Sequence, residues 1–196
     1  MTFSITTVSG KEIEPYLADL ARLRIEVFRE FPYLYDGSME YEQSYLRTYA
    51  RSRESMAVLV FDNAALVGAS TGLPLSDESE EFWRPFEESG YQTDSVFYCA
   101  ESVLKKEYRG RGIYSEFFHE REKHARTLNR FNLICFCAVE RDSRHPLKPT
   151  GYEPLDPVWR KFGYEKHPEL TTEFLWKDVD EDTESSKKMV FWMKPI

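Results

Sequence analysis

Apolar residues recur along the chain at spacings that predict strands and helices. Alternating or continuous apolar runs, which are typical of strands, lie at 3–7, 56–61, 64–73, 96–104, 133–139, 170–179 and 188–194. Spacings of three and four residues, which place side chains on one helix face, cover 15–31, a segment after Ser38, and 113–128. A short helix is predicted at 157–162. No repeat or linker interrupts this series, so we expect residues 1–196 to form a single domain.

Residues that favour helix ends stand at the borders of these segments. Ser9 and Glu12 have the spacing of a capping box, and Ser38 is suited to cap the second helix. Pro32 is expected to end the first helix, because proline cannot continue a helix without losing a hydrogen bond.

The run 96–104 is apolar or small at nearly every position, except for the carboxylate Glu101. A strand without alternation is covered on both faces, which predicts a place in the centre of the sheet. With the helix 113–128 and the apolar run 133–139 it forms a βαβ unit of two parallel strands. We therefore predict an α/β (α+β) fold: a mixed, mostly antiparallel sheet with one parallel unit and helices on both faces.

The charge balance limits the classes of partner. Lys and Arg number 26 against 34 Asp and Glu, a formal net charge of −8, which argues against nucleic-acid partners. The acidic runs 77–81 and 178–184 are interpreted as solvated loops. No apolar stretch reaches the ~20 residues that cross a bilayer, and the first residues lack a signal-peptide pattern. We expect a cytoplasmic protein with no membrane partner.

The cysteines and histidines do not indicate a metal site or a disulfide framework. The three cysteines include no Cys-x-x-Cys pair. His119 and His124 are five residues apart, about 140° around a helix, whereas helical zinc ligands of this kind are four apart. Cys99 lies two residues before Glu101 and would allow an acyl-cysteine route, although buried cysteines are usually inert.

The segment Arg109-Gly110-Arg111-Gly112-Ile113-Tyr114 carries the clearest chemical signal. Its two glycines allow backbone amides to approach a ligand closely. The helix that begins there adds unpaired N–H groups and a dipole that favour an anion, and the two arginines add positive charge. We predict a diphosphate site; the alternative is a basic turn that only caps the helix.

Two other phosphate-binding patterns fit less well. A Walker loop requires Gly-Lys-Ser/Thr, which is missing here. In a dinucleotide fingerprint Ser115 would take the place of the third glycine. Glu140 could then serve as the ribose-binding acid, but the chain after it is predicted to turn antiparallel.

The segment 103–113 resembles the signature of the GNAT acetyltransferase superfamily, a strand followed by Arg/Gln-x-x-Gly-x-Gly/Ala at the start of a helix. The segment 158–164 resembles the later Tyr-x-x-x-Gly-Phe segment of that superfamily, and the order of elements agrees over nearly the whole chain. Within the superfamily, the chain resembles the acetyltransferase-like half that some proteins carry beside a carbon–nitrogen hydrolase.

The resemblance implies a function and a set of contacts. It implies transfer of an acetyl or short acyl group from acyl-CoA to a primary amine, without a metal. Acetyl-CoA would be the co-substrate, with its pantetheine held by the main chain of Val103 and Leu104. Its diphosphate would be held by the amides of the turn from Arg109 to Tyr114. The loop after the first helix borders the acceptor pocket in the superfamily, which implies acceptor contacts from Tyr33 and Tyr35; the alternative is that these rings pack into the core.

Three positions depart from the superfamily pattern. Tyr114 stands where the signature has Gly or Ala, and Trp159 stands where many members have the tyrosine that protonates the leaving thiolate. No asparagine follows Val139, where members often carry one that contacts the coenzyme.

The reaction narrows the choice of catalytic residues. Acyl transfer from a thioester requires a neutral amine and an oxyanion site, and it is helped by a proton for the leaving sulfur. Glu101 is the predicted general base, because burial would raise its pKa; the alternative is a structural carboxylate paired with an arginine. Either no acid is used, because a thiolate is already a tolerable leaving group, or a tyrosine substitutes for the one missing at position 159. Tyr152, in the long loop 140–156, is the predicted acid; the alternative is that it packs that loop onto the body.

A different class of function also agrees with these residues. Trp159 and the missing asparagine favour a module that binds acyl-CoA or a protein partner without catalysis, whereas the turn and Glu101 favour the enzyme. The acceptor could be a small-molecule amine or a protein amine. The sequence leaves the oligomeric state open, a homodimer included.

Overall fold

The computed structural model describes residues 3–196. The strands are β1 (Phe3–Ser9), β2 (Met56–Asp62), β3 (Ala65–Pro74), β4 (Val96–Tyr98), β5 (Ser102–Leu104), β6 (Leu133–Val139), β7 (Glu165–Trp176) and β8 (Ser185–Pro195). The helices are α1 (Leu17–Phe28), α2 (Met39–Arg51), α3 (Glu80–Glu88), α4 (Ile113–Thr127) and α5 (Asp156–Lys161). Short 3-10 turns occupy Gly10–Tyr16, Leu75–Asp77, Thr93–Ser95 and Lys106–Tyr108.

Local capping explains where two of the helices begin. Ser9 and Glu12 form the predicted capping box, but it opens the 3-10 turn Gly10–Tyr16 rather than an α-helix. The Ser38 hydroxyl accepts a hydrogen bond from the Tyr41 amide at 3.3 Å and caps α2, as predicted.

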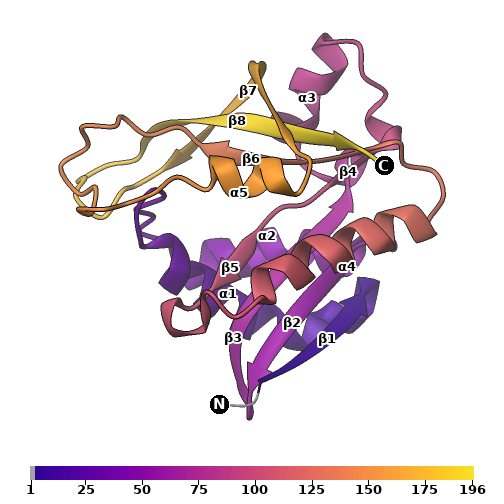
Figure 1. Cartoon of the computed structure of the whole chain (residues 1–196), viewed down its shortest axis with the longest axis horizontal. Helices are drawn as coiled ribbons and strands as arrows, with labels where there is room; N and C mark the ends of the chain where they lie inside the picture. The colour runs from indigo at the N-terminus through magenta and orange to yellow at the C-terminus, as the bar shows by residue number, and fades with distance from the viewer. Residues whose placement is uncertain (1–2) are drawn as a thin grey trace.

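The sheet has the order β1-β2-β3-β4-β6-β8-β7, with β5 paired to β3. Among the described strands, β4 and β6 form the only parallel pair. The connection from β4 to β6 contains β5 and helix α4. Helix α4 crosses one face of the sheet, and α1 and α2 lie on the other (Figure 1). The predicted fold class is therefore confirmed.

Each face of the sheet has its own hydrophobic core, because residues alternate between the faces along a strand. In β2, Ala57 and Leu59 pack with α1 and α2, whereas Val58 and Val60 pack with the side chains of α4. Helices thus cover both faces of the sheet. A ligand can therefore reach the sheet only where a strand edge is exposed.

The predicted single strand 96–104 is wrong at its centre. Residues 99–101 belong to no strand, and they separate β4 from β5. The pairing of β4 with β6 ends at Tyr98 and Cys135, followed by one bond from the Cys99 amide to the Cys135 carbonyl at 2.7 Å. Beyond this point β5 pairs with β3, whereas β6 continues to Val139 alongside β8. The two strands therefore diverge.

Two further expectations need correction. The first helix ends at Phe28 rather than near Phe31, because the chain leaves the helical conformation in a turn over residues 29–34. Leu34 in this turn has a positive φ of 55°. Neither acidic run is wholly solvated, since Glu78 is only 6% exposed and Asp178, the first residue of the run 178–184, only 2%. No helix within residues 3–196 is long and apolar enough to cross a bilayer.

Candidate active site

The divergence of β5 from β6 leaves one backbone edge of β5 without a strand partner. Backbone hydrogen bonds at Glu101 and Lys105 join this segment to β3. In an antiparallel ladder alternate residues bond to the same neighbour, so the backbone groups of Val103 also face β3. Those of Ser102 and Leu104 face the opening. Of the two predicted pantetheine contacts, the structure directs the main chain of Leu104 toward the opening and that of Val103 away from it.

The turn between β5 and α4 presents backbone amides to open space. Gly110 and Gly112 have φ of 74° and 82°, a left-handed conformation that glycine adopts without strain. A Cβ at either position would meet no atom within 4 Å. Within residues 3–196 the amides of Gly110, Gly112, Ile113 and Tyr114 donate to no protein acceptor. The turn thus has the open amides at a helix N-terminus that a diphosphate site requires.

The two arginines of the turn lie on its exposed side. Arg109 donates from Nε to the Leu104 carbonyl at 3.0 Å and pairs with Glu30 at 2.9 Å. The Arg111 guanidinium lies over the Tyr108 ring, 5.5 Å from its centroid. Arg109 therefore fixes the turn to the end of β5, and both arginines keep positive charge beside the open amides.

The side chain of Tyr114 points from the first turn of α4 toward α5. Its hydroxyl oxygen accepts a hydrogen bond from Trp159 Nε1 at 3.0 Å, and its ring packs edge-on against Phe118. Burial raises the pKa of the Tyr114 hydroxyl, and the hydrogen bond from Trp159 partly opposes this. Burial, then Cys137 and Tyr114, raise the pKa of the Tyr33 hydroxyl. Tyr114 and Trp159, two of the three departures from the superfamily pattern, are therefore in direct contact with each other.

A cavity of about 1070 Å³ opens on the α1 and α2 side of the diverging strands. Its lining joins the loop after α1, helix α2, the break at 99–101 and the β7–β8 hairpin. The predicted acceptor residues Tyr33 and Tyr35 both line it. Their rings lie against Trp176, with centroids 6.3 and 6.4 Å away, so they pack inward and face the cavity at the same time.

Arg141 holds the loop that carries these tyrosines. It donates to the carbonyls of Pro32 and Tyr33 at 2.6 and 2.5 Å, and it pairs with the buried Asp178 at 2.5 Å. Asp178 also accepts from Trp176 Nε1 at 2.8 Å. The loop is thus tied to the β7–β8 hairpin, which fixes the shape of the cavity wall; no spacing in the sequence connects these residues.

The predicted base Glu101 lies in the break between β4 and β5 and lines the cavity. Its Oε2 accepts a hydrogen bond from Arg24 Nη1 at 2.5 Å, and Arg24 Nε donates to Glu42 Oε2 at 2.5 Å. Burial raises the pKa of Glu101, while the charge of Arg24 opposes the rise. Glu101 is thus paired with an arginine, as the structural alternative expects, and it also lines the cavity. Its role as the base stays a prediction.

A second buried carboxyl was not found from the sequence. Glu78 accepts hydrogen bonds from the hydroxyls of Tyr49 and Tyr45 at 2.9 and 3.4 Å. Burial raises its pKa to about 7. Its place within an acidic run gave no signal of burial; the helical spacing of Tyr45 and Tyr49 gave the only indication of a shared face.

Tyr152 lies in the loop 140–156 and is half-buried. Its ring stands edge-on to Phe31, with centroids 4.7 Å apart, and burial raises the pKa of its hydroxyl. The loop is thereby packed against the chain after α1, so Tyr152 is close to the loop of Tyr33 but is not among the residues that line the cavity.

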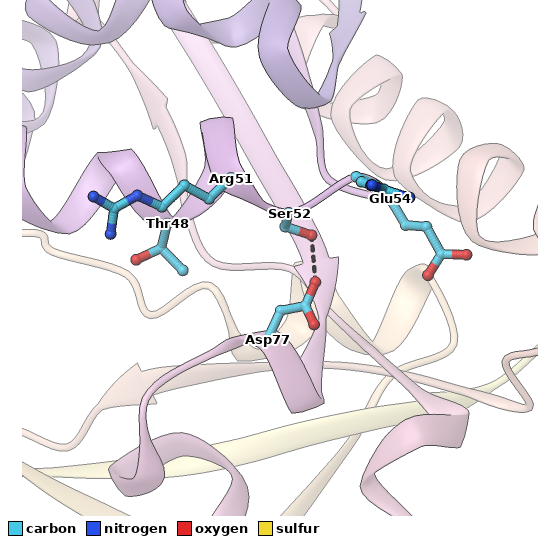
Figure 2. Close-up of a pocket in the computed structure, with 6 residues that line it drawn as sticks. Thr48, Arg51, Ser52, Glu54 and Asp77 are labelled. Carbon is cyan, nitrogen blue, oxygen red and sulfur yellow. Dashed lines mark hydrogen bonds between the residues drawn. The ribbon is translucent and has the colours of Figure 1, made fainter.

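Other polar groupings contribute less. Near the C-terminal end of α2 a depression of about 670 Å³ contains Ser52, which donates to Asp77 at 2.5 Å (Figure 2). His145, Asp178 and Asp180 place ligand atoms within 4.8 Å of one another, but Asp178 is already in ion pairs. Burial raises the pKa of the Cys99 thiol to about 11, which disfavours an acyl-cysteine route.

Comparison with known proteins identifies the fold. No family model and no curated protein matches the sequence. Among solved structures, a ribosomal-protein-alanine N-acetyltransferase from Brucella melitensis is similar with a TM-score of 0.63 and 14% identity, covering 98% of this chain and 99% of that one. A GNAT-family acetyltransferase from Streptococcus pneumoniae gives a TM-score of 0.60 at 13% identity, over 100% and 99% of the two chains. An acetyltransferase from Streptococcus agalactiae gives 0.61 at 14% identity, over 99% and 98%.

These similarities extend over entire chains, so they concern the complete domain. The chain has the fold of the GNAT acetyltransferases, which confirms the resemblance seen in its turn and its element order. At these identities the likeness shows the fold, and the chemistry has to be argued from the site itself.

Proposed function

We propose that this protein transfers an acetyl or short acyl group from acyl-CoA to a primary amine. The observation that carries the proposal is the open turn: four backbone amides without protein acceptors lie at the start of α4, directly after the free edge of β5. A diphosphate bound there would place the attached pantetheine along that edge, and the cavity on the other side would supply the amine.

The residues around the cavity fit direct transfer. Glu101 accepts a proton from the acceptor ammonium, and the neutral nitrogen attacks the carbonyl carbon of the thioester. The amide of Leu104 faces the opening and is a donor for the developing oxyanion. The carbon–sulfur bond then breaks, and the thiolate receives the second proton of the nitrogen through a hydroxyl group.

Tyr114 is the hydroxyl that we favour for the last step. Because its oxygen accepts from Trp159, its own O–H is directed elsewhere. Neither Tyr114 nor Tyr152 is among the residues that line the cavity. In this proposal the tyrosine missing at position 159 is replaced by one at position 114. Tyr152, the residue suggested by its loop, is the other candidate.

The test of coenzyme binding is the substitution Gly112→Asp. It adds a side chain and a negative charge at the proposed diphosphate site. Saturating acetyl-CoA, at about 100 times its Kd, should stabilise the wild-type protein by about 2.7 kcal/mol, and the variant should lose this shift in Tm.

Gly90→Asp is the matched control. Gly90 also has a φ of 82° and no atom within 4 Å of a Cβ, but it lies after α3, away from the turn. Both variants therefore carry the same backbone strain and charge. An acetyl-CoA shift that survives in a folded Gly112→Asp protein would exclude this turn as the coenzyme site.

A non-catalytic acyl-CoA-binding module is the second candidate, favoured by Trp159 at the tyrosine position. It predicts the same shift in Tm with acetyl-CoA and no acylated product with any amine. Release of the CoA thiol that depends on an added amine separates the enzyme from the module.

A further inference from the structure

The floor of the cavity is a buried cluster of one arginine and two glutamates. Arg24 of α1 donates to Glu42 of α2 and to Glu101 at the strand break, both at 2.5 Å. Glu42 is 0% and Glu101 3% exposed. One guanidinium thus serves two buried carboxylates, and the buried Arg121, whose Nη1 lies 3.5 Å from the Glu101 carbonyl oxygen, is a second positive charge near Glu101.

The second oxygen of each carboxylate lacks a partner. Oε1 of Glu42 and Oε1 of Glu101 are buried and accept no hydrogen bond of good geometry from the described part of the chain. The hydroxyls of Tyr35 and Thr71 lie near enough to Glu42 and Glu101, respectively, to act on these carboxylates. Arg24 is held between the rings of Phe28 and Tyr45, 5.0 and 4.7 Å from their centroids. A buried acceptor without a donor is destabilising. An ammonium group, with three donors and one positive charge, would satisfy both oxygens.

A second group of acids surrounds the mouth of the same cavity. Glu81, Glu173, Asp182 and Glu184 line it and are exposed, and none of the four forms an ion pair with a basic group in residues 3–196. Lys177, the basic residue at the mouth, is already paired with an acid at 2.7 Å. Aromatic side chains line the space between floor and mouth: Tyr33, Tyr35, Tyr41, Phe174 and Trp176.

Resting on the acyl transfer proposed above, we infer that the acceptor is a small dication, a linear alkyl diamine or oligoamine. Its reacting nitrogen lies against Glu42 and Glu101, its methylene chain lies between the aromatic rings, and its second ammonium lies among the acids of the mouth. The first ammonium then meets the two floor carboxylates, and the second meets the nearest of the four acids at the mouth. A monoamine leaves the acids at the mouth without a positive partner. An amino acid brings a carboxylate to these acids, which repel it.

The transfer balances in this arrangement. The ammonium at the floor gives one proton to Glu101, its nitrogen bonds to the acyl carbon as the carbon–sulfur bond breaks, and its second proton passes to the departing thiolate. Glu101 returns its proton to solvent. The amide product has lost the positive charge that the floor binds, so it is held more weakly than the substrate.

The test compares three acceptors with the same four-carbon chain: putrescine, butylamine and γ-aminobutyrate. They end in a cation, a methyl group and an anion. With thiol release from acetyl-CoA as the readout, kcat/KM for putrescine should exceed that for butylamine at least about 10-fold, the effect of one charge-assisted contact. γ-Aminobutyrate should be the poorest acceptor.

Two double variants locate the preference. Asp182→Asn with Glu184→Gln removes charge from the mouth and should reduce the putrescine-to-butylamine ratio several-fold. Glu87→Gln with Glu88→Gln removes the same charge from exposed positions on α3 that do not line the cavity, and it should keep the wild-type ratio. An equal loss in both variants would assign the preference to the overall acidic surface and overturn the inference.

The outcomes separate this inference from the proposed reaction. Acetylation of butylamine as efficient as that of putrescine overturns the dication and leaves acyl transfer in place, and so does a lysine peptide preferred over putrescine. If no amine is acetylated, calorimetry with CoA present decides: binding of putrescine but not butylamine keeps the dication site and rejects the transfer. Equal or absent binding overturns both.

Discussion

Glu78 offers a prediction whose size follows from the structure. Its carboxyl is 6% exposed and accepts hydrogen bonds from the hydroxyl of Tyr49 and the amide of Ser79, at 2.9 and 3.3 Å. Burial nevertheless dominates and raises its pKa from 4.5 to about 7. The folded protein therefore holds this proton at a pH where the unfolded chain has released it.

The sign of the effect on stability follows from this rise. A raised folded-state pKa contributes stability that is fully present below about pH 4.5 and is lost as the pH rises through about 7. The difference between these two values, at 1.36 kcal/mol per pKa unit, corresponds to about 3 kcal/mol. Glu78→Gln removes the titrating group but keeps an oxygen that can accept from Tyr49.

The assay is urea denaturation of both proteins between about pH 4.5 and about pH 8.5. The stability of Glu78→Gln relative to wild type should rise by up to about 3 kcal/mol over this range. Any pH-independent cost of the glutamine cancels in the comparison. Glu88→Gln, at the exposed end of α3, corrects for the change in net charge. A difference between Glu78→Gln and wild type that stays constant with pH would refute the buried, proton-holding carboxyl.

Three further predictions concern the site. Glu101→Gln should lower kcat roughly 10²–10⁴-fold and remove the low-pH limb of the rate profile; near-full activity with the same limb would leave Glu101 a structural role. Tyr114→Phe should lower kcat with little change in Tm, whereas Tyr152→Phe should leave kcat near wild type; the reverse order would assign the acid to the loop 140–156. Tyr33→Ala should raise the KM of the amine while the acetyl-CoA shift in Tm persists, and a loss of stability without a kinetic change would make Tyr33 a packing residue only.

The coenzyme turn could be predicted because its chemistry is local. Gly110, Gly112 and the start of α4 are adjacent in the chain, so spacing alone places open amides at a helix N-terminus. The same holds for the cap at Ser38 and for the order of strands and helices. Such features depend on a few consecutive residues, and their geometry survives in any context that buries the flanking strand and helix.

The floor of the cavity could not be predicted in the same way. Arg24 meets Glu42 across 18 residues and Glu101 across 77, a juxtaposition that only the packed sheet and helices create. The break at 99–101 could not be predicted either. The apolar run continues through it, and nothing in the run indicates that the neighbouring strand changes from β6 for β4 to β3 for β5. Tyr114 and Trp159 are 45 residues apart in the chain. The sequence therefore showed two unrelated departures from the superfamily pattern, and only the structure shows that the two side chains are in contact.

The central claim is that this fold transfers an acyl group through the opening between β5 and β6. The most direct measurement is mass spectrometry of putrescine incubated with acetyl-CoA and the protein, with CoA thiol counted in the same sample. The account predicts one acetyl group gained by the amine for each thiol released, with both signals lost in Gly112→Asp and kept in Gly90→Asp. Thiol release without an acetylated amine, or acetylation that persists in Gly112→Asp, would contradict it.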